Sequence, residues 1–253
     1  MSEFKIAWLF PDTMYLHGER GNILALARYA EFAGYTPSVV KVDFDTEDFD
    51  PAAYDILFMA PGEVVSFPSV IQWLRPYRDK LEAYVASGRP MLVTGTSIGL
   101  FGRKITREDG TVFEGLGMIG LETKERDSVY GDDDYFRVNY NGEEMEIIGS
   151  TIQMCDFRME DEKPFGELIY GYGNNGKDRQ EGVQVRNAVF TNALGPVLVC
   201  NPWLTKEMIR VAAAVRGDGD VPIDADMSLE KKSFEMKKYF NLHKKTNLTN
   251  CAG

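Results

Sequence analysis

Residues 95–99, GTSIG, follow an apolar run and fit the G-x-S-x-G pattern. In hydrolases with this pattern the serine lies at a sharp turn between a strand and a helix, beside backbone N–H groups that can stabilise an oxyanion. Ser97 is therefore one candidate nucleophile, and Thr94 and Thr96 beside it are alternatives. The competing interpretation is a glycine-rich tight turn with no chemistry.

A serine nucleophile needs a general base, normally a histidine, and the chain has 2 histidines. His17 lies in the segment FPDTMYLHGERGN, after the first predicted strand, and could approach the same edge of the sheet. His243 lies in the last predicted helix, where we expect it to be exposed. A Ser97–His17 pair stays open as a hypothesis, although a motif match without its partner residues is weak evidence.

The elements that position these residues alternate between strand and helix up to about residue 103. FKIAWLF, TPSVVKVDF, YDILFMAPG and PMLVTG are typical of buried strands, whereas GNILALARYAEFAG and PSVIQWLRPYRDKLEAYVASG have helical spacing, with a break expected at Pro76. This alternation predicts an α/β fold with a doubly wound, largely parallel, flavodoxin-like sheet. Ligands of such sheets bind beyond the carboxyl ends of the strands, where FPDTMYLHGERGN, MAPGEVV and VTGTSIGLFG should meet.

The pattern changes after residue 102. EMEIIGSTIQMCDF, FGELIYGYG, EGVQVRNAVFTNAL and PVLVC are predicted as strands without long helices between them, so we expect added antiparallel strands in the C-terminal half. The acidic run YGDDDYF is predicted as a solvated loop. WLTKEMIRVAAAV and MSLEKKSFEMKKYFNLHKK are predicted helices, followed by a loose tail, TNLTNCAG. We expect one domain over residues 1–222, with a C-terminal helix and tail over residues 223–253.

Composition excludes several classes of protein. With 253 residues and 44% hydrophobic side chains the chain can bury a full core, and its net charge of −11 disfavours nucleic acid as a partner. No basic–apolar leader and no run of about 18 apolar residues occur, which predicts neither a signal peptide nor a membrane span. Cys155, Cys200 and Cys251 lack metal-ligand or CxxC spacing. We therefore expect a cytoplasmic protein without a metal or cofactor.

Several segments in register resemble one family, the class I glutamine amidotransferases of the cobyric acid synthase type. The nearest branch is the glutaminase subunit of lipid II isoglutaminyl synthase. Its first loop reads approximately Tyr-Pro-Asp-x-x-Asn-x-Tyr-Gly-Asp-x-Gly-Asn, which corresponds to FPDTMYLHGERGN here. Its later segments Gly-Tyr-Gly-Asn-Asn with Glu-Gly-Val, and Gly-Thr-Tyr-x-His-Gly-Pro-x-Leu with Asn-Pro, correspond to GYGNN, EGV and FTNALGPVLVCNP. Order and spacing hold over roughly residues 4–215.

The resemblance implies a Cys-His pair that hydrolyses glutamine and a partner that receives the ammonia after activating a carboxylate with ATP. This sequence departs from the family at those positions. The family elbow reads Cys-Gly-Gly-Tyr-Gln-x-Leu-Gly, and the ungapped match from Pro90 to LFGRK places Gly95 at the cysteine. The family histidine falls on Leu194, and the oxyanion loop falls on APG, where Pro61 removes a backbone donor. Neither Gly95 nor Leu194 can attack a carbonyl or move a proton.

The resemblance also implies positions that contact a ligand. Gln153, in GSTIQMC, falls where the family pattern Gly-Tyr-Glu-Ile-His-Met-Gly has histidine. Arg126 lies near a substrate-contacting arginine of the nearest branch, although an ordinary surface arginine is an equally good interpretation. Cys155 and Cys200 fall outside the elbow and do not replace the nucleophile. The candidate ligand-binding residues are Gly62, Gly95, Thr96, Ser97, Arg126 and Gln153.

Three functions remain open on these grounds. The favoured one is an amidotransferase-like protein that has lost glutaminase chemistry and acts as a non-catalytic subunit or binding module beside an ATP-dependent ligase of the Mur type. The second is a serine-dependent hydrolase or acyltransferase that uses Ser97. The third is a binding protein for a small, glutamine-like molecule. The resemblance alone implies the ligase partner.

Overall fold

The computed structural model describes residues 2–244 and has two six-stranded sheets. The strands are β1 (Glu3–Leu9), β2 (Thr36–Val42), β3 (Ile56–Met59), β4 (Met91–Thr94), β5 (Lys104–Thr106), β6 (Val112–Glu114), β7 (Leu121–Tyr140), β8 (Glu143–Met159), β9 (Gly166–Tyr170), β10 (Gln180–Glu181), β11 (Val183–Val185) and β12 (Ala188–Thr191). The α-helices are α1 (Arg20–Phe32), α2 (Phe67–Leu74), α3 (Arg78–Ala86), α4 (Ile98–Phe101), α5 (Val197–Cys200), α6 (Pro202–Arg216) and α7 (Ser228–His243).

The first sheet has the strand order β11-β12-β4-β3-β1-β2. Neighbouring strands in this sheet are parallel, except that β11 and β12 form an antiparallel pair. Every residue of β3 and β4 is buried, because strands covered on both faces have no side exposed to water. The predicted doubly wound, largely parallel sheet is confirmed.

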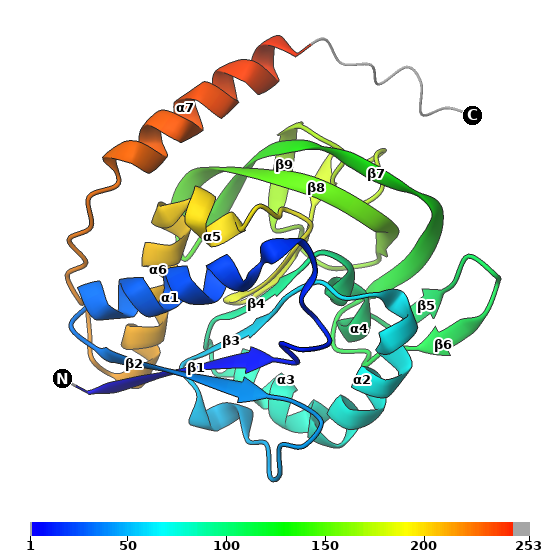
Figure 1. Ribbon diagram of the computed structural model, residues 1–253, viewed down its shortest axis with the longest axis horizontal. Helices are drawn as coiled ribbons and strands as arrows, with labels where there is room; N and C mark the ends of the chain where they lie inside the picture. Colours follow the sequence, from blue (N-terminus) through cyan, green and yellow to red (C-terminus); the bar gives the residue numbers. More distant parts are fainter. Residues whose placement is uncertain (1, 245–253) are drawn as a thin grey trace.

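Helices cover both faces of this sheet (Figure 1). Side chains alternate along β1, so Leu9 packs in one apolar cluster with residues of α2 and α3, and Ile6 packs in the other with residues of α1 and α6. The two clusters are therefore the two sides of one sheet. A 3₁₀ turn at Arg75–Tyr77 separates α2 from α3, as the position of Pro76 predicts.

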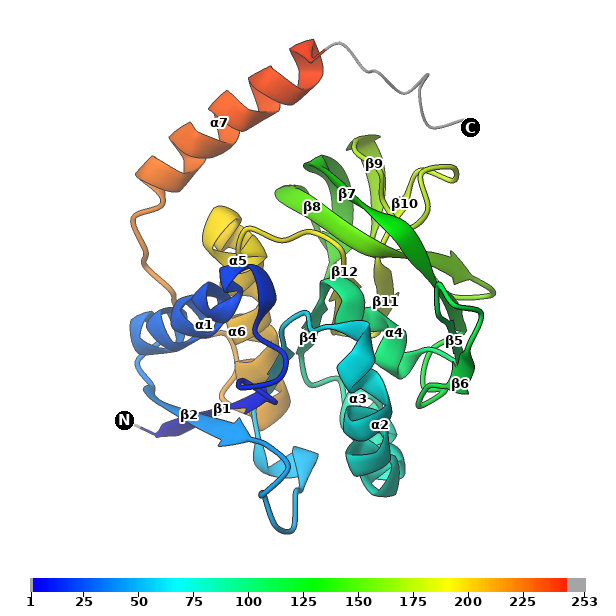
Figure 2. The ribbon, with the colours of Figure 1, turned by 45° about the vertical axis from the view of Figure 1, so that its right-hand side comes forward.

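The second sheet is formed by β10-β9-β7-β5-β6, with β8 paired to β7. β7 and β8 make a long antiparallel hairpin that curves over one end of the first sheet (Figure 2). The pairing of this hairpin shifts register between Glu125 and Tyr130, an irregularity of the kind that bends a strand. The antiparallel strands were expected to extend the first sheet. They instead form a second sheet, in which β5 and β7 are parallel.

Two local predictions were wrong. PVLVC forms the short helix α5 rather than a strand, because tertiary contacts decide the conformation of a short apolar run: the side-chain oxygen of Asn22 accepts the N–H of Leu198 at 2.9 Å. YGDDDYF lies inside β7 rather than in a solvated loop. Its third aspartate, Asp134, is fully buried and accepts the hydroxyl of Thr151 on β8, which provides the polar contact that a buried carboxyl requires.

The terminal helix α7 packs on the second sheet and α5. Phe234 is 8% exposed and lies edge-on to Trp203, with ring centroids 4.9 Å apart. Lys238 donates to Glu146 on β8 at 2.6 Å. Within residues 2–244 no helix is long and apolar enough to cross a membrane. The predicted tail and Cys251 lie outside the described residues, and the division at residue 222 stays a prediction.

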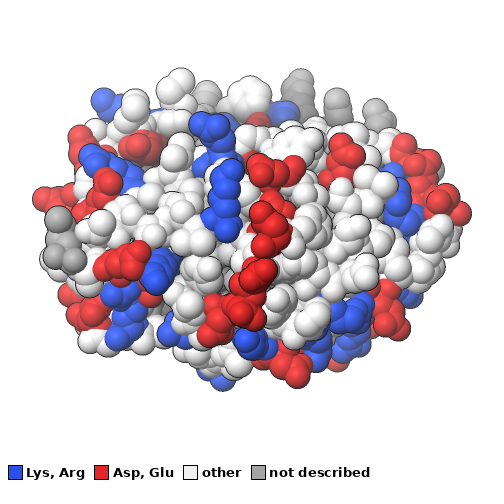
Figure 3. Space-filling view, turned by 60° about the horizontal axis from the view of Figure 1, so that its bottom comes forward, with Lys and Arg blue, Asp and Glu red and all other residues white. Residues whose placement is uncertain are grey.

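Charged side chains on the face drawn in Figure 3 are intermixed, and acidic side chains form a short band across its middle. Among the described residues on this face, basic side chains do not gather into one broad area. Phosphate backbones are bound by such gathered basic side chains. This face therefore lacks the electrostatic features of a nucleic-acid site, in keeping with the net charge of −11.

Candidate functional site

A sharp turn joins β4 to α4 at the carboxyl edge of the first sheet. β4 ends at Thr94, residues Gly95–Ser97 form a 3₁₀ turn, and α4 follows directly. Gly95 has φ +59°, in the left-handed region that favours glycine. The strand–turn–helix elbow predicted from GTSIG is therefore present, and Gly95 is its first residue.

Gly95 and Leu194 lie against each other at this elbow. β12 pairs with β4 through Thr191 and Thr94, so the segment after β12 runs beside the turn after β4. A Cβ atom added to Gly95 would lie 3.4 Å from Cδ2 of Leu194 and 3.0 Å from Cβ and Cγ of Pro61. Apolar atoms thus fill the space into which a side chain at position 95 would project.

The backbone N–H of Gly62, a candidate oxyanion donor, is already engaged. It donates to the hydroxyl oxygen of Thr96 at 3.2 Å, and the same hydroxyl donates to the carbonyl of Gly62 at 2.6 Å. Met14 covers this glycine so closely that an added Cβ would lie 1.9 Å from its sulfur. A donor bound to Thr96 cannot also stabilise an oxyanion without rearrangement.

Ser97 has the environment of a structural serine. Its side chain is fully buried, and its hydroxyl donates to the carbonyl of Ala60 at 2.7 Å. His17 stays accessible to solvent while partial burial lowers its pKa, and no hydrogen bond among the described residues joins it to Ser97. His243 is exposed on α7, where its ring stacks on Tyr239. The structure therefore shows no serine–histidine pair.

The two described cysteines lack the properties of a nucleophile. Cys155 is buried on β8, and burial raises the pKa of its thiol to about 12. Cys200, half-buried at the end of α5, donates to the carbonyl of Gly195 at 3.1 Å, and burial raises its pKa as well. A thiol attacks as the thiolate, so raised pKa values leave both side chains unreactive near neutral pH.

Glu19 is a buried acid beside the elbow that sequence reasoning missed. Its carboxylate accepts the N–H of Gly195 at 2.9 Å and the side-chain amide of Asn22 at 2.6 Å. Burial raises the pKa of Glu19 to about 7 despite these bonds. Glu19 thus ties the first loop to the segment that carries Leu194. The one sequence feature that could have indicated a role for Glu19 is its place in FPDTMYLHGERGN, the loop at the same sheet edge.

Glu181 and Asp134 form a second buried acidic group behind the same segment. Glu181 accepts the hydroxyl of Thr191 at 3.0 Å and the N–H of Asn192 at 2.6 Å. Burial, and then the charge of Asp134, raise the pKa of Glu181 to about 8, and burial raises the pKa of Asp134 to about 6. Glu181 thus holds the chain leading to Leu194, whereas Asp134 accepts the hydroxyl of Thr151 and the N–H of Tyr172. The EGV motif was the only sequence signal for Glu181.

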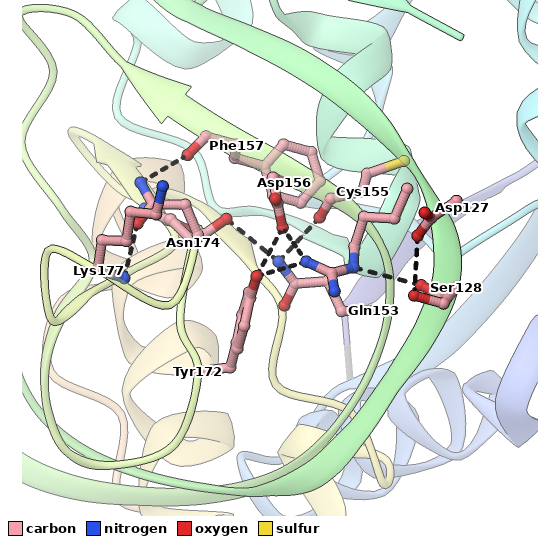
Figure 4. Close-up of polar contacts among 11 residues, drawn as sticks. Asp127, Ser128, Gln153, Cys155, Asp156, Phe157, Tyr172, Asn174 and Lys177 are labelled. Carbon is pink, nitrogen blue, oxygen red and sulfur yellow. Dashed lines mark hydrogen bonds and ion pairs between the residues drawn. The ribbon is translucent and has the colours of Figure 1, made fainter. Parts of the chain in front are cut away.

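Gln153 lies in a polar cluster with Asp156, Tyr172 and Asn174 (Figure 4). Arg126 joins this cluster through Asp156 and the hydroxyl of Tyr172. The amide of Gln153 donates to the carbonyls of Cys155 at 2.8 Å and Asn174 at 3.1 Å, whereas its buried oxygen has no hydrogen-bond partner within residues 2–244. Arg126 pairs with Asp156 at 3.0 Å, and its guanidinium lies 5.2 Å from the ring centre of Tyr172. Arg126 is therefore a restrained arginine rather than a free surface charge.

A cavity of about 400 Å³ opens beside the elbow. Residues from both sheets line it, among them His17, Gly62, Thr96, Arg107, Glu125 and Ile152. Arg126 instead lines an adjoining cavity of about 330 Å³ that shares Arg107 and Glu125.

The cavity thus gathers Gly62 and Thr96 from the candidate ligand-binding set. Gly95, Ser97 and Gln153 do not line it, and neither does Leu194. Within residues 2–244, no group of three or more His, Cys, Asp or Glu side chains could hold a metal ion.

The parallel sheet and its elbow define the fold of glutamine amidotransferases. A solved structure of a glutamine amidotransferase aligns with a TM-score of 0.51 at 14% identity, over 82% of this chain and 98% of that one. This likeness concerns the fold alone. No protein-family model matches the chain.

Two curated proteins extend the similarity from the fold to the sequence. The chain is 28% identical over 223 residues to the GatD subunit of lipid II isoglutaminyl synthase (glutamine-hydrolyzing) from Streptococcus pneumoniae, covering 88% of this chain and 85% of that protein. It is 25% identical over 240 residues to GatD from Staphylococcus aureus, covering 91% and 93%. The resemblance to this branch of glutamine amidotransferases is confirmed.

Proposed function

We propose that this chain is an amidotransferase-like subunit without glutaminase activity, which works in the cytoplasm beside an ATP-dependent ligase of the Mur type. The observation that carries the proposal is the apolar packing of Leu194 and Pro61 over Gly95. Glutamine hydrolysis by this family needs a nucleophile and a base, and loss of either removes most of the rate. Similarity to GatD, a subunit of lipid II isoglutaminyl synthase, supports a place in an amidating or ligating complex.

The surrounding architecture supports a retained role in assembly. Glu19 and Glu181 hold the segment around Leu194 from two sides, although no catalytic side chain remains there to be positioned. Packing and catalysis use different residues, so a subunit interface can persist after the chemistry is lost. The partner ligase would then use free ammonia or another nucleophile.

Affinity purification of the full chain from native extract, followed by mass spectrometry, tests this assembly. We expect a stable heterocomplex with a Mur-ligase-like protein, with an interface of at least about 1,000 Å². The partner should also raise the melting temperature of the chain, because it binds the folded state. Recovery of the chain alone, at native abundance and in low salt, would count against the complex.

A small-molecule binding protein is the second candidate. The cavity of about 400 Å³ favours it, because ligand sites commonly enclose about 300–1,000 Å³. The serine-dependent hydrolase has no comparable support, since the hydroxyl of Ser97 is buried and donates to Ala60. We retain residues 1–222 as the amidotransferase-like domain and residues 223–253 as an appended helix and tail.

A further inference from the structure

The cavity beside the elbow presents two opposite charges side by side. Nε of Arg107 donates to Oε2 of Glu125 at 2.5 Å, and the N–H of Glu108 donates to the same oxygen at 3.1 Å. Among the described residues, Nη1 and Nη2 of Arg107 and Oε1 of Glu125 have no hydrogen-bond partner. One end of the cavity therefore offers unused cationic donors beside an unused anionic acceptor.

The pair is also partly withdrawn from water. The side chain of Arg107 is 28% exposed and that of Glu125 is 11% exposed. Electrostatic interactions strengthen where less water screens them. Two groups of this kind suit a ligand that carries both a carboxylate and an ammonium group, because each of its charges meets its opposite.

Apart from His17, Glu63 and the Gly62–Thr96 contact, the remaining wall of the cavity is apolar and partly exposed to water. Val65, Val129 and Ile152 line it and are 63%, 58% and 37% exposed. Covering such side chains with an apolar group removes them from water and is favourable. The wall thus matches an aliphatic side chain better than a polar one.

The elbow side of the cavity offers little to a carboxamide. The hydroxyl of Thr96 and the N–H of Gly62 are bonded to each other. Gly95 and Leu194 do not line the cavity. A molecule bound in the cavity would not contact Gly95 or Leu194, so it would not be converted chemically and would dissociate unchanged. A polar side chain of such a molecule would lose hydrogen bonds to water and gain few replacements from the protein.

We propose that this cavity is a reversible binding site for a free α-amino acid with an aliphatic side chain. Its carboxylate accepts from the free guanidinium nitrogens of Arg107, and its ammonium group donates to Oε1 of Glu125. The side chain covers Val129 and Ile152. The inference rests on the second candidate function, the small-molecule binding protein, and does not require the ligase partner.

Calorimetric titration and thermal melting of the full chain with L-leucine test the site. We expect leucine to bind and to raise the melting temperature. Leucinamide lacks the carboxylate and N-acetyl-leucine lacks the ammonium group, so each should bind about tenfold more weakly or worse, as expected for the loss of one charge-assisted hydrogen bond. Glutamine should also bind about tenfold more weakly, because its carboxamide meets an aliphatic wall.

Variants locate the binding on this cavity. Arg107→Gln and Glu125→Gln should each weaken leucine binding about tenfold or more. The matched control is Arg103→Gln, which removes an exposed arginine paired with Glu160 that lines neither cavity, and it should bind leucine as the wild type does. Ile152→Thr keeps the charged pair of Arg107 and Glu125. It should weaken the binding of leucine more than it weakens the binding of alanine. If Arg107→Gln does not fold, Ile152→Thr and the leucine analogues still decide the question.

Three results would overturn the inference. They are no response to leucine, equal affinity for glutamine and leucine, and full leucine binding by folded Arg107→Gln. These outcomes are separate from the failure of the ligase complex, which is judged by purification from extract. Release of ammonia from glutamine would refute the proposed loss of glutaminase activity. The leucine titration would still test the amino-acid site independently of that result.

Discussion

The hydroxyl of Thr96 accepts the N–H of Gly62 at 3.2 Å and donates to the carbonyl of the same residue at 2.6 Å. This double contact joins the loop after β3 to the elbow after β4. It occupies the backbone donor of Gly62, which the family resemblance places in the oxyanion loop. The elbow is thus closed by a polar contact on one side of Gly95 and by Pro61 and Leu194 on the other.

Thr96→Val tests the structural role of that contact. The change keeps the shape of the side chain and leaves the buried carbonyl of Gly62 without this donor, so we expect a loss of about 1–3 kcal/mol in the free energy of unfolding. Urea denaturation measures it. Thr36→Val, at an exposed strand position, is the control and should change stability little. Equal effects of the two substitutions would show that the Thr96 contact is unimportant.

Gly95→Ala measures the crowding over the elbow. Gly117→Ala is the matched control, because Gly117 has φ +67° with no atom within 4 Å of an added Cβ, whereas Gly95 has φ +59° with Pro61 at 3.0 Å. The left-handed backbone should cost about 1–2 kcal/mol at either site. Overpacking should add about 1–3 kcal/mol at Gly95 alone. Equal losses in urea denaturation would mean that the space above Gly95 is open.

Ser97→Ala separates a structural serine from a nucleophile. The variant loses the buried hydrogen bond to Ala60, so stability should fall by about 1 kcal/mol, whereas exposed Ser128→Ala should be nearly neutral. A serine-directed fluorophosphonate probe should label neither the wild type nor the variant at residue 97. Labelling of the wild type that disappears in Ser97→Ala would revive the hydrolase hypothesis.

Glu181 makes folding stability depend on pH. Its folded pKa, about 8, exceeds the ordinary value of 4.5, so the unfolded state loses this proton first as pH rises. Stability associated with this group is therefore complete below about pH 4 and is lost as pH rises toward about 8. Between pH 5 and 9 the free energy of unfolding should fall by about 2–4 kcal/mol less in Glu181→Gln than in the wild type. The exposed control Glu144→Gln should show the same decline as the wild type. An unchanged slope in urea titrations would contradict the assignment.

The sequence predicts the first sheet well because its signals are local. Apolar runs and helical spacing give the alternation, and the ungapped match around Gly95 places the elbow where β4 meets α4. The parallel pairing of Thr191 with Thr94 then brings Leu194 to it. The sequence alone therefore predicts the elements that depend on short-range patterns and on the family alignment.

What the sequence does not predict depends on distant contacts. PVLVC is predicted as a strand, but a short apolar run is also compatible with a helix, and the side chain of Asn22 helps to decide. The burial of Glu19 and of Asp134 follows from loops and strands that meet only in the folded chain, and charged residues are ordinarily exposed. The sequence does not predict the cavity for the same reason, since its lining residues, such as His17, Thr96 and Ile152, come from segments far apart in the chain.

Ammonia release from glutamine tests the central claim most directly. Purified chain should release none above background, either alone or together with any ligase that co-purifies with it, because Gly95 and Leu194 supply neither nucleophile nor base. Boiled protein and glutamine without protein give the background, and a glutaminase of known activity verifies the assay. Sustained turnover that scales with the concentration of this chain would contradict the account.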